Sequence, residues 1–157
     1  MKISELFEKK QKQPGTYAAA ALSDKTKHNI SQYFKDNDVK NPCDVDKMHC
    51  TILYSSKHLP DYKAKGKYDK PLIGKNCRFE IWPNREKTEN VLVLRINCPE
   101  MTKRHKHLMK EHDAQYDFPD YKPHVSFSYD VGDVKVSDFK PIDFDIEFTT
   151  EYQEDLD

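Results

Sequence analysis

The feature that most constrains the fold of this chain is an order of predicted elements that occurs twice. A strand, a helix, a loop and a histidine-bearing strand follow one another in the first half of the sequence and again in the second. Tyr17 precedes His49 by 32 positions, and Leu92 precedes His124 by the same number. Matched order and spacing indicate one supersecondary unit used twice, which predicts an α+β fold with a pseudo-two-fold axis.

The expected elements follow from hydrophobic periodicity and from residues that begin helices. Ser23 is a predicted N-cap, and Pro99 is a predicted first residue of a helix. The alanine-rich stretch at 16–23 suits a helix equally well, but we interpret it as a buried strand. Strands are thus predicted at 16–23, 48–55, 77–83, 89–97, 124–129 and 143–150, helices at 4–12, 24–36 and 99–116, and a long loop at 56–70.

The length of 157 residues fits one domain with a sizeable core. We expect a single domain over 1–157, with a first lobe at about 16–82 and a second at about 90–150. The acidic C-terminal end is expected to be flexible, because chain ends are often poorly ordered.

Composition argues against several classes of partner. The net charge of −1 provides no general attraction to long nucleic acid or to a membrane. Apolar runs are too short to span a bilayer, and the N-terminus lacks the apolar core of a signal peptide. The four cysteines form no C-x-x-C pair, so we expect reduced thiols in a cytoplasm.

The two histidine-bearing strands carry the same short motif, His-x-Thr at 49–51 and His-x-Ser at 124–126. Residues two apart on a strand point to the same side, so each histidine shares a face with its hydroxyl. In the first strand this alternation places Leu53 on the face of His49 and Tyr54 on the other. If the halves face each other, two imidazoles and two hydroxyls meet in one cleft.

Such a constellation suits phosphodiester chemistry without a metal. One imidazole takes a proton from the attacking oxygen, the other gives one to the leaving oxygen, and the hydroxyls bind the phosphate oxygens. A single His-x-Thr is weak support, since a histidine on a strand can equally be a core residue. The second copy strengthens the prediction because its flanks also match: a basic residue precedes each histidine, and an apolar residue and a tyrosine follow the hydroxyl.

The paired motifs "HCT" and "HVS" resemble the two-histidine (2H) phosphoesterase superfamily. The stretches "GTYAAA", "MHCTILYSSKHLP" and "YKPHVSFSYD" are similar to phage anti-CBASS nucleases, which destroy the cyclic oligonucleotide signals of bacterial antiphage defence. The resemblance implies a two-lobed pseudo-two-fold fold, with antiparallel sheets flanked by helices around a central cleft.

The resemblance also implies a mechanism and its residues. A substrate 2′-hydroxyl would attack the adjacent 3′–5′ phosphodiester and form a 2′,3′-cyclic phosphate, which water would open to a linear product. His49 and His124 become the acid–base pair, with Thr51 and Ser126 as phosphate binders, and no cofactor or metal is implied. Which histidine is the base stays open at this point.

Three further residues are candidate substrate contacts. Tyr17 and Trp82 could stack on nucleobases, although both could also be core aromatics. The family places an acidic base contact near its C-terminus, and Glu151 is the nearest match. The excess of acidic residues in that region disfavours long RNA, so we expect a compact cyclic di- or trinucleotide as the partner.

Other interpretations remain open or are disfavoured. The lysines of the 56–70 loop could form a lid that contacts phosphates, or simply a solvated loop. His105 and His107 in "RHKHLMKEHD" lie about 200° apart on a helix and cannot hold one ion together, so we predict no metal site. Alternative functions are a 2H esterase for RNA ends or 2′–5′ oligoadenylates, and a protein that binds cyclic nucleotides without cleaving them.

Overall fold

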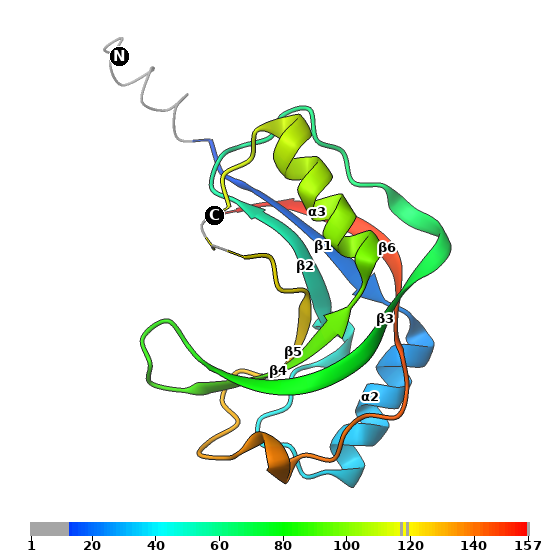
Figure 1. The fold of residues 1–157 in the computed structure, drawn as a ribbon, viewed down its shortest axis with the longest axis vertical. Coiled ribbons are helices and arrows are strands. Elements are labelled where there is room, and N and C mark those ends of the chain that lie inside the picture. The colour runs from blue at the N-terminus through cyan, green and yellow to red at the C-terminus, as the bar shows by residue number, and fades with distance from the viewer. Residues whose placement is uncertain (1–12, 117, 119, 157) are drawn as a thin grey trace.

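The computed structural model describes residues 13–116, 118 and 120–156, and its strands form one antiparallel sheet that closes on itself (Figure 1). The strand order around the sheet is β1-β2-β5-β4-β3-β6. The predicted helix at 4–12 lies outside the described residues. The strands are β1 (Thr16–Leu22), β2 (His49–Ser55), β3 (Gly66–Pro83), β4 (Asn90–Asn97), β5 (His124–Ser128) and β6 (Ile146–Asp155), and the helices are α2 (Asp24–Asp36) and α3 (Pro99–His112).

The sheet has the predicted pseudo-two-fold symmetry. Exchanging β1 with β4, β2 with β5 and β3 with β6 leaves the closed strand order unchanged. The axis passes between β2 and β5, which are neighbours, and between β3 and β6, which are also neighbours. The two histidine-bearing strands therefore lie side by side on the axis.

A β-bulge recurs in both copies of the repeat. The strand pairing around it shows that Tyr17 and Leu92, which are equally spaced from the histidines in the sequence, are not structurally equivalent. Ala18 pairs with Leu53 in the first half and Leu92 pairs with Ser128 in the second, each just before a register shift. Leu53 and Ser128 both lie four residues after the motif histidine, so Ala18, rather than Tyr17, is the equivalent of Leu92. A bulge adds one residue to one strand of a pair.

The alanine-rich stretch forms a central strand. Ala18, Ala19 and Ala20 are fully buried, with β2 on one side of β1 and β6 on the other. Backbone pairing on both edges favours the strand over the helix that the alanines would also allow. Ser23 caps the following helix as predicted, since its hydroxyl accepts a hydrogen bond from the Thr26 N–H at 3.1 Å.

The three largest differences from the predicted boundaries are in β3, β6 and α3. β3 begins at Gly66 rather than at 77, so the predicted loop ends early; its first part pairs with β6, a partner far away in sequence. β6 continues to Asp155 through the acidic end, because that end pairs with β1. α3 ends at His112, where Asp113 adopts a left-handed conformation with φ of 50°.

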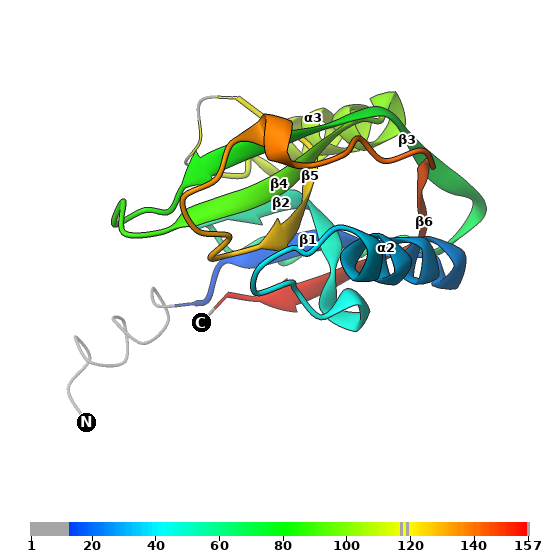
Figure 2. The same ribbon diagram turned by 90° about the horizontal axis from the view of Figure 1, so that it is seen from below.

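The helices lie apart from each other with strands between them (Figure 2). The side chains that each helix packs against the sheet differ in chemistry. Tyr33 of α2 packs against Phe79 of β3 and Phe127 of β5, with ring centroids 5.5 Å and 6.2 Å away. α3 covers β2 instead, where its buried His105 donates from Nδ1 to the Ile52 carbonyl at 2.7 Å.

No helix within the described ranges is both long enough and apolar enough to cross a membrane.

Candidate active site

The two motif histidines lie on adjacent antiparallel strands and face the same cavity. Cys50 of β2 pairs with Val125 of β5. Antiparallel geometry then places His49 opposite Ser126 and Thr51 opposite His124, so the imidazoles are diagonal neighbours across the junction of the strands. All four side chains line one cavity of about 720 Å³, and both histidines are half-buried.

Each imidazole is oriented by its own backbone. His49 Nδ1 lies 2.9 Å from the carbonyl oxygen of Lys47, and His124 Nδ1 lies 2.7 Å from that of Lys122. A carbonyl can only accept, so Nδ1 carries the proton in both rings. The Nε2 atom of each ring is therefore the one available for proton transfer.

The two motif hydroxyls differ in their surroundings. The Tyr17 and Thr51 hydroxyl oxygens are 2.9 Å apart, and the Tyr17 ring meets the His49 ring edge-on with centroids 5.9 Å apart. Burial raises the Tyr17 pKa, so this phenol stays protonated. The Ser126 hydroxyl has no hydrogen-bond partner among the residues that the structure describes.

Trp82 lies against the other histidine. Its ring centroid is 4.6 Å from that of His124, and its indole N–H donates to Glu80 at 2.9 Å. Glu80 also accepts from Arg95 at 3.3 Å, and Arg95 pairs with His124 across β4 and β5. Trp82 lines an adjoining cavity of about 460 Å³, which shares four lining residues with the first: Tyr116, Phe118, Lys122 and His124.

These neighbours make His124 electrostatically distinct. Burial is the largest cause of its lowered pKa, because it disfavours the charged ring. The charges of Arg95 and His49 lower the pKa further, whereas the Lys122 carbonyl and the Glu80 carboxylate act in the opposite direction. The balance favours the neutral imidazole, which can accept a proton at Nε2.

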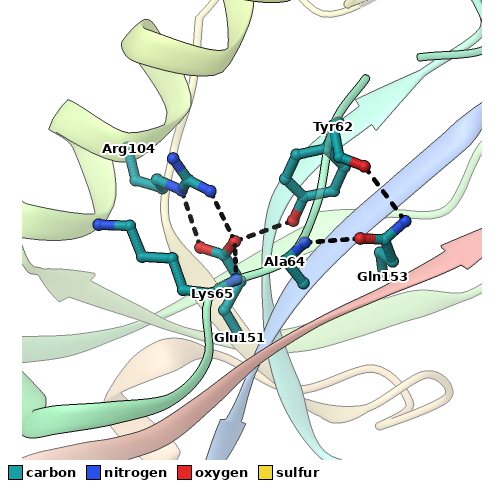
Figure 3. Close-up of polar contacts among 6 residues, drawn as sticks. All are labelled: Tyr62, Ala64, Lys65, Arg104, Glu151 and Gln153. Carbon is teal, nitrogen blue, oxygen red and sulfur yellow. Dashed lines mark hydrogen bonds and ion pairs between the residues drawn. The ribbon is translucent and has the colours of Figure 1, made fainter. Parts of the chain in front are cut away.

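Glu151 lies away from the cavity, under α3, where it is 1% exposed (Figure 3). Arg104 donates to it with two nitrogens, each at 2.9 Å, and the Tyr62 hydroxyl and the Lys65 N–H add bonds of 3.0 Å and 2.9 Å. Gln153 accepts from the Ala64 N–H beside this network. The structure therefore does not bring Glu151 together with the histidines.

The Glu151 carboxylate is held in its charged form by these donors. Burial alone would raise its pKa, but the bonds from Arg104, from the Lys65 N–H and from Tyr62 outweigh burial and lower it. The carboxylate oxygens accept hydrogen bonds from Arg104 of α3 and from Tyr62 and Lys65 in the segment before β3. No local pattern indicates this role, because Arg104 is 47 residues away from Glu151 in the chain.

The prediction that Tyr54 lies on the strand face opposite His49 is wrong, since both side chains line the cavity. The bulge in β2 leaves Ile52 without a partner in β1 and shifts the alternation, so Leu53 is buried and Tyr54 lines the cavity with His49 and Thr51. A register shift between Leu92 and Val93 in β4 affects the second copy in the same way. The repeated tyrosine after each motif was the signal that could have identified these positions.

Two aromatic side chains, the half-buried Tyr121 and the buried His105, support the bulge of β2. The Tyr121 hydroxyl donates to the Thr51 carbonyl at 2.7 Å, next to the bond that His105 makes to Ile52. The Tyr121 and His105 rings are stacked, with centroids 4.1 Å apart. His105 is therefore a buried structural residue. Over residues 13–116, 118 and 120–156, no group of three or more His, Cys, Asp or Glu side chains is placed to hold a metal ion.

Sequence comparison relates the chain to phage proteins of one name. A family model described as "Anti-CBASS protein Acb1" matches residues 14–157. A protein of that name from Vibrio phage KVP40 is 32% identical over 157 residues, which cover 100% of this chain and 95% of the relative. Another, from Enterobacteria phage T4, is 29% identical over 154 residues, covering 96% of this chain and 94% of the relative.

Solved structures of low sequence identity share the fold. Escherichia coli LigT complexed with 3′-AMP superimposes with a TM-score of 0.61 at 13% identity, over 90% of this chain and 87% of LigT. A structure described as a phosphoesterase gives a TM-score of 0.60 at 12% identity, with the same coverage. The likeness confirms the predicted fold class.

Proposed function

The chain belongs to the family of the anti-CBASS protein Acb1, and from that premise we propose that it hydrolyses 3′–5′ bonds of cyclic di- and trinucleotide immune signals. One observation carries the proposal: two imidazoles with available Nε2 atoms and two hydroxyls line a single cavity. The products are linear nucleotides, which no longer act as the cyclic signal. The cavity volume is within the usual range for small-molecule sites.

In the first step the substrate supplies its own nucleophile. The 2′-oxygen attacks the adjacent phosphorus while His124 Nε2 takes the 2′-hydroxyl proton. The bond between phosphorus and the 5′-oxygen breaks, and His49 Nε2 gives that oxygen a proton. General acid–base help of this kind typically contributes about 10²- to 10⁴-fold.

We assign His124 as the base because its pKa is lowered by burial and by neighbouring cations, so its ring is neutral at neutral pH. His49 then acts as the acid. The Thr51 and Ser126 hydroxyls donate to the non-bridging oxygens as negative charge grows there. The Tyr17 phenol orients the Thr51 hydroxyl, to which it is hydrogen-bonded.

In the second step a water molecule opens the 2′,3′-cyclic phosphate. His49, now neutral, takes a proton from the water as its oxygen attacks phosphorus. His124, now charged, returns a proton to the leaving 2′-oxygen. Both rings are back in their starting states, and one water has been consumed for each bond cleaved.

Two of the remaining candidates have different roles. The Trp82 ring forms a wall beside His124 and borders the adjoining cavity, where a base of the substrate can stack on it. Glu151 is a structural residue because its oxygens are occupied by donors of the protein. We place the activity in a bacterial cytoplasm, where such signals circulate, with no membrane or long nucleic acid as partner.

The test is to incubate the protein with a panel of cyclic di- and trinucleotides in EDTA and to identify products by mass spectrometry. We expect rings to become linear nucleotides with a terminal phosphate, at undiminished rate with chelator. Return of intact rings after denaturation would identify a binding protein instead. Cleavage of linear RNA ends or 2′–5′ oligoadenylates in preference to the rings would identify another 2H esterase.

A further inference from the structure

We propose that Tyr54 and Tyr129 are a matched pair of base-stacking residues, one for each of the two bases that flank the phosphate between the histidines. The inference rests on the proposed function and adds how that site recognises its substrate. It concerns residues outside the acid–base machinery.

The two tyrosines are equivalent under the pseudo-two-fold axis. Tyr54 follows His49 by five residues, Tyr129 follows His124 by five, and both line the same cavity as the histidines. Since β2 and β5 are antiparallel, the residues that follow the two histidines extend away from the axis in opposite directions. The tyrosines therefore approach the cavity from its two ends, with the reacting phosphate between them.

Their exposure needs an explanation. Among the residues that the structure describes, four large apolar side chains are exposed, and three of them line this cavity. Tyr54 is 42% exposed and Tyr129 is 59% exposed. Within the same described residues, neither hydroxyl has a hydrogen-bond partner. Exposed rings gathered at one hollow mark a binding surface rather than a core.

The ligand chemistry follows from the position of the rings. A phosphodiester held between the histidines carries one nucleoside on each side, so a base extends toward each end of the cavity. A base offers a flat π face to an aromatic ring, and such stacking tolerates any base. The lysines that precede the histidines, Lys47 and Lys122, also line the cavity and supply positive charge on both sides of the axis.

The first experiment separates stacking from catalysis by kinetics on a cyclic dinucleotide. We expect Tyr54→Ala and Tyr129→Ala each to raise KM about 10-fold or more with kcat changed far less, because stacking is lost and the acid–base pair is intact. Phenylalanine at either position should restore most of the lost affinity. Val136→Ala, which removes an exposed apolar side chain elsewhere, is the control.

The second experiment observes the stack directly. A cyclic dinucleotide containing 2-aminopurine is titrated into the His124→Ala variant, in which turnover is expected to be too slow to consume the ring during the titration. Quenching of the fluorescence should weaken when Tyr54→Ala or Tyr129→Ala is added and should persist with phenylalanine. Quenching in a protein that never cleaves the ring would support this inference and overturn the proposed function. Normal KM and unchanged quenching in both alanine variants would overturn the inference alone.

Discussion

The two halves of this protein share one backbone design but place different chemistry around it. At the cavity, Ala21 is the β1 residue opposite His49, whereas Arg95 is the β4 residue opposite His124. Under the helices, Glu151 of β6 pairs with Ala20 of β1, whereas Phe79 of β3, the symmetry equivalent of β6, pairs with Leu94 of β4. The repeat sets the positions of the reacting groups, and the unmatched neighbours assign their roles.

The first prediction breaks the symmetry of the histidines and has the largest expected effect. Both His49→Ala and His124→Ala should lower kcat by about 10²- to 10⁴-fold. A substrate whose 5′-oxygen is replaced by sulfur needs no acid, since a thiolate leaves readily. His49→Ala should regain activity on that substrate, while His124→Ala should not.

Steady-state rates on the two substrates check this assignment, with His28→Ala, an exposed histidine of α2, as the control. Rescue of His124→Ala instead would exchange the roles of acid and base.

The second prediction concerns the polar cluster of Glu151 and Arg104 under α3. Glu151→Gln leaves the Arg104 guanidinium without its ion-pair partner, and removing one member of a buried pair typically costs roughly 3–5 kcal/mol. Urea unfolding should show this loss, and the exposed neighbour Glu154→Gln should show almost none. Equal midpoints for the two variants would contradict the structural role.

The same cluster predicts an acid sensitivity confined to the side of the barrel under α3. The folded-state pKa of Glu151 is lowered, so its contribution to stability is present above the ordinary carboxyl pKa of 4.5 and is lost as pH falls through the folded pKa. Phe79 offers no such group. Hydrogen-exchange protection factors measured below pH 4.5 should therefore fall in β6 and α3 before they fall around Phe79, and a uniform fall would argue against it.

A smaller effect is expected from replacing Arg95, which lies opposite His124 where the first motif has the uncharged Ala21 opposite His49. Arg95→Met removes a cation beside His124 and one of the donors to the Glu80 carboxylate, and both changes raise the His124 pKa. A base with a higher pKa is protonated over a wider range, so the acid limb of the kcat/KM profile should shift to higher pH. Arg85→Met, at an exposed turn, should leave the profile in place.

The smallest effect is expected from removing the hydrogen bond between Tyr17 and the Thr51 hydroxyl of the first motif. Tyr17→Phe removes the bond to Thr51, and a neutral hydrogen bond is worth about 0.5–1.5 kcal/mol, so kcat should fall a few-fold. Tyr33→Phe is a matched control because it loses a 2.7 Å bond to the Lys140 carbonyl away from the cavity. An equal fall in both variants would mean that the loss is one of folding.

Local patterns in the sequence were sufficient to predict the repeat and to place the four motif side chains at one cavity, because a strand's two-residue period puts a histidine and its hydroxyl on one face. They were insufficient where a distant partner decides. Gly66 begins a strand only because Glu151 pairs with it, and the fate of Glu151 depends on Arg104. The bulge at Ile52 also has no local signature, and it alone reverses the face of Tyr54.

The histidine-bearing strands share a single registered pair, Cys50 opposite Val125, whereas β1 and β2 are paired along nearly their whole length. Because these strands share so few backbone pairs, the separation of the two imidazoles depends on contacts outside this ladder, such as the 2.8 Å bond from the Cys43 N–H to the Phe127 carbonyl.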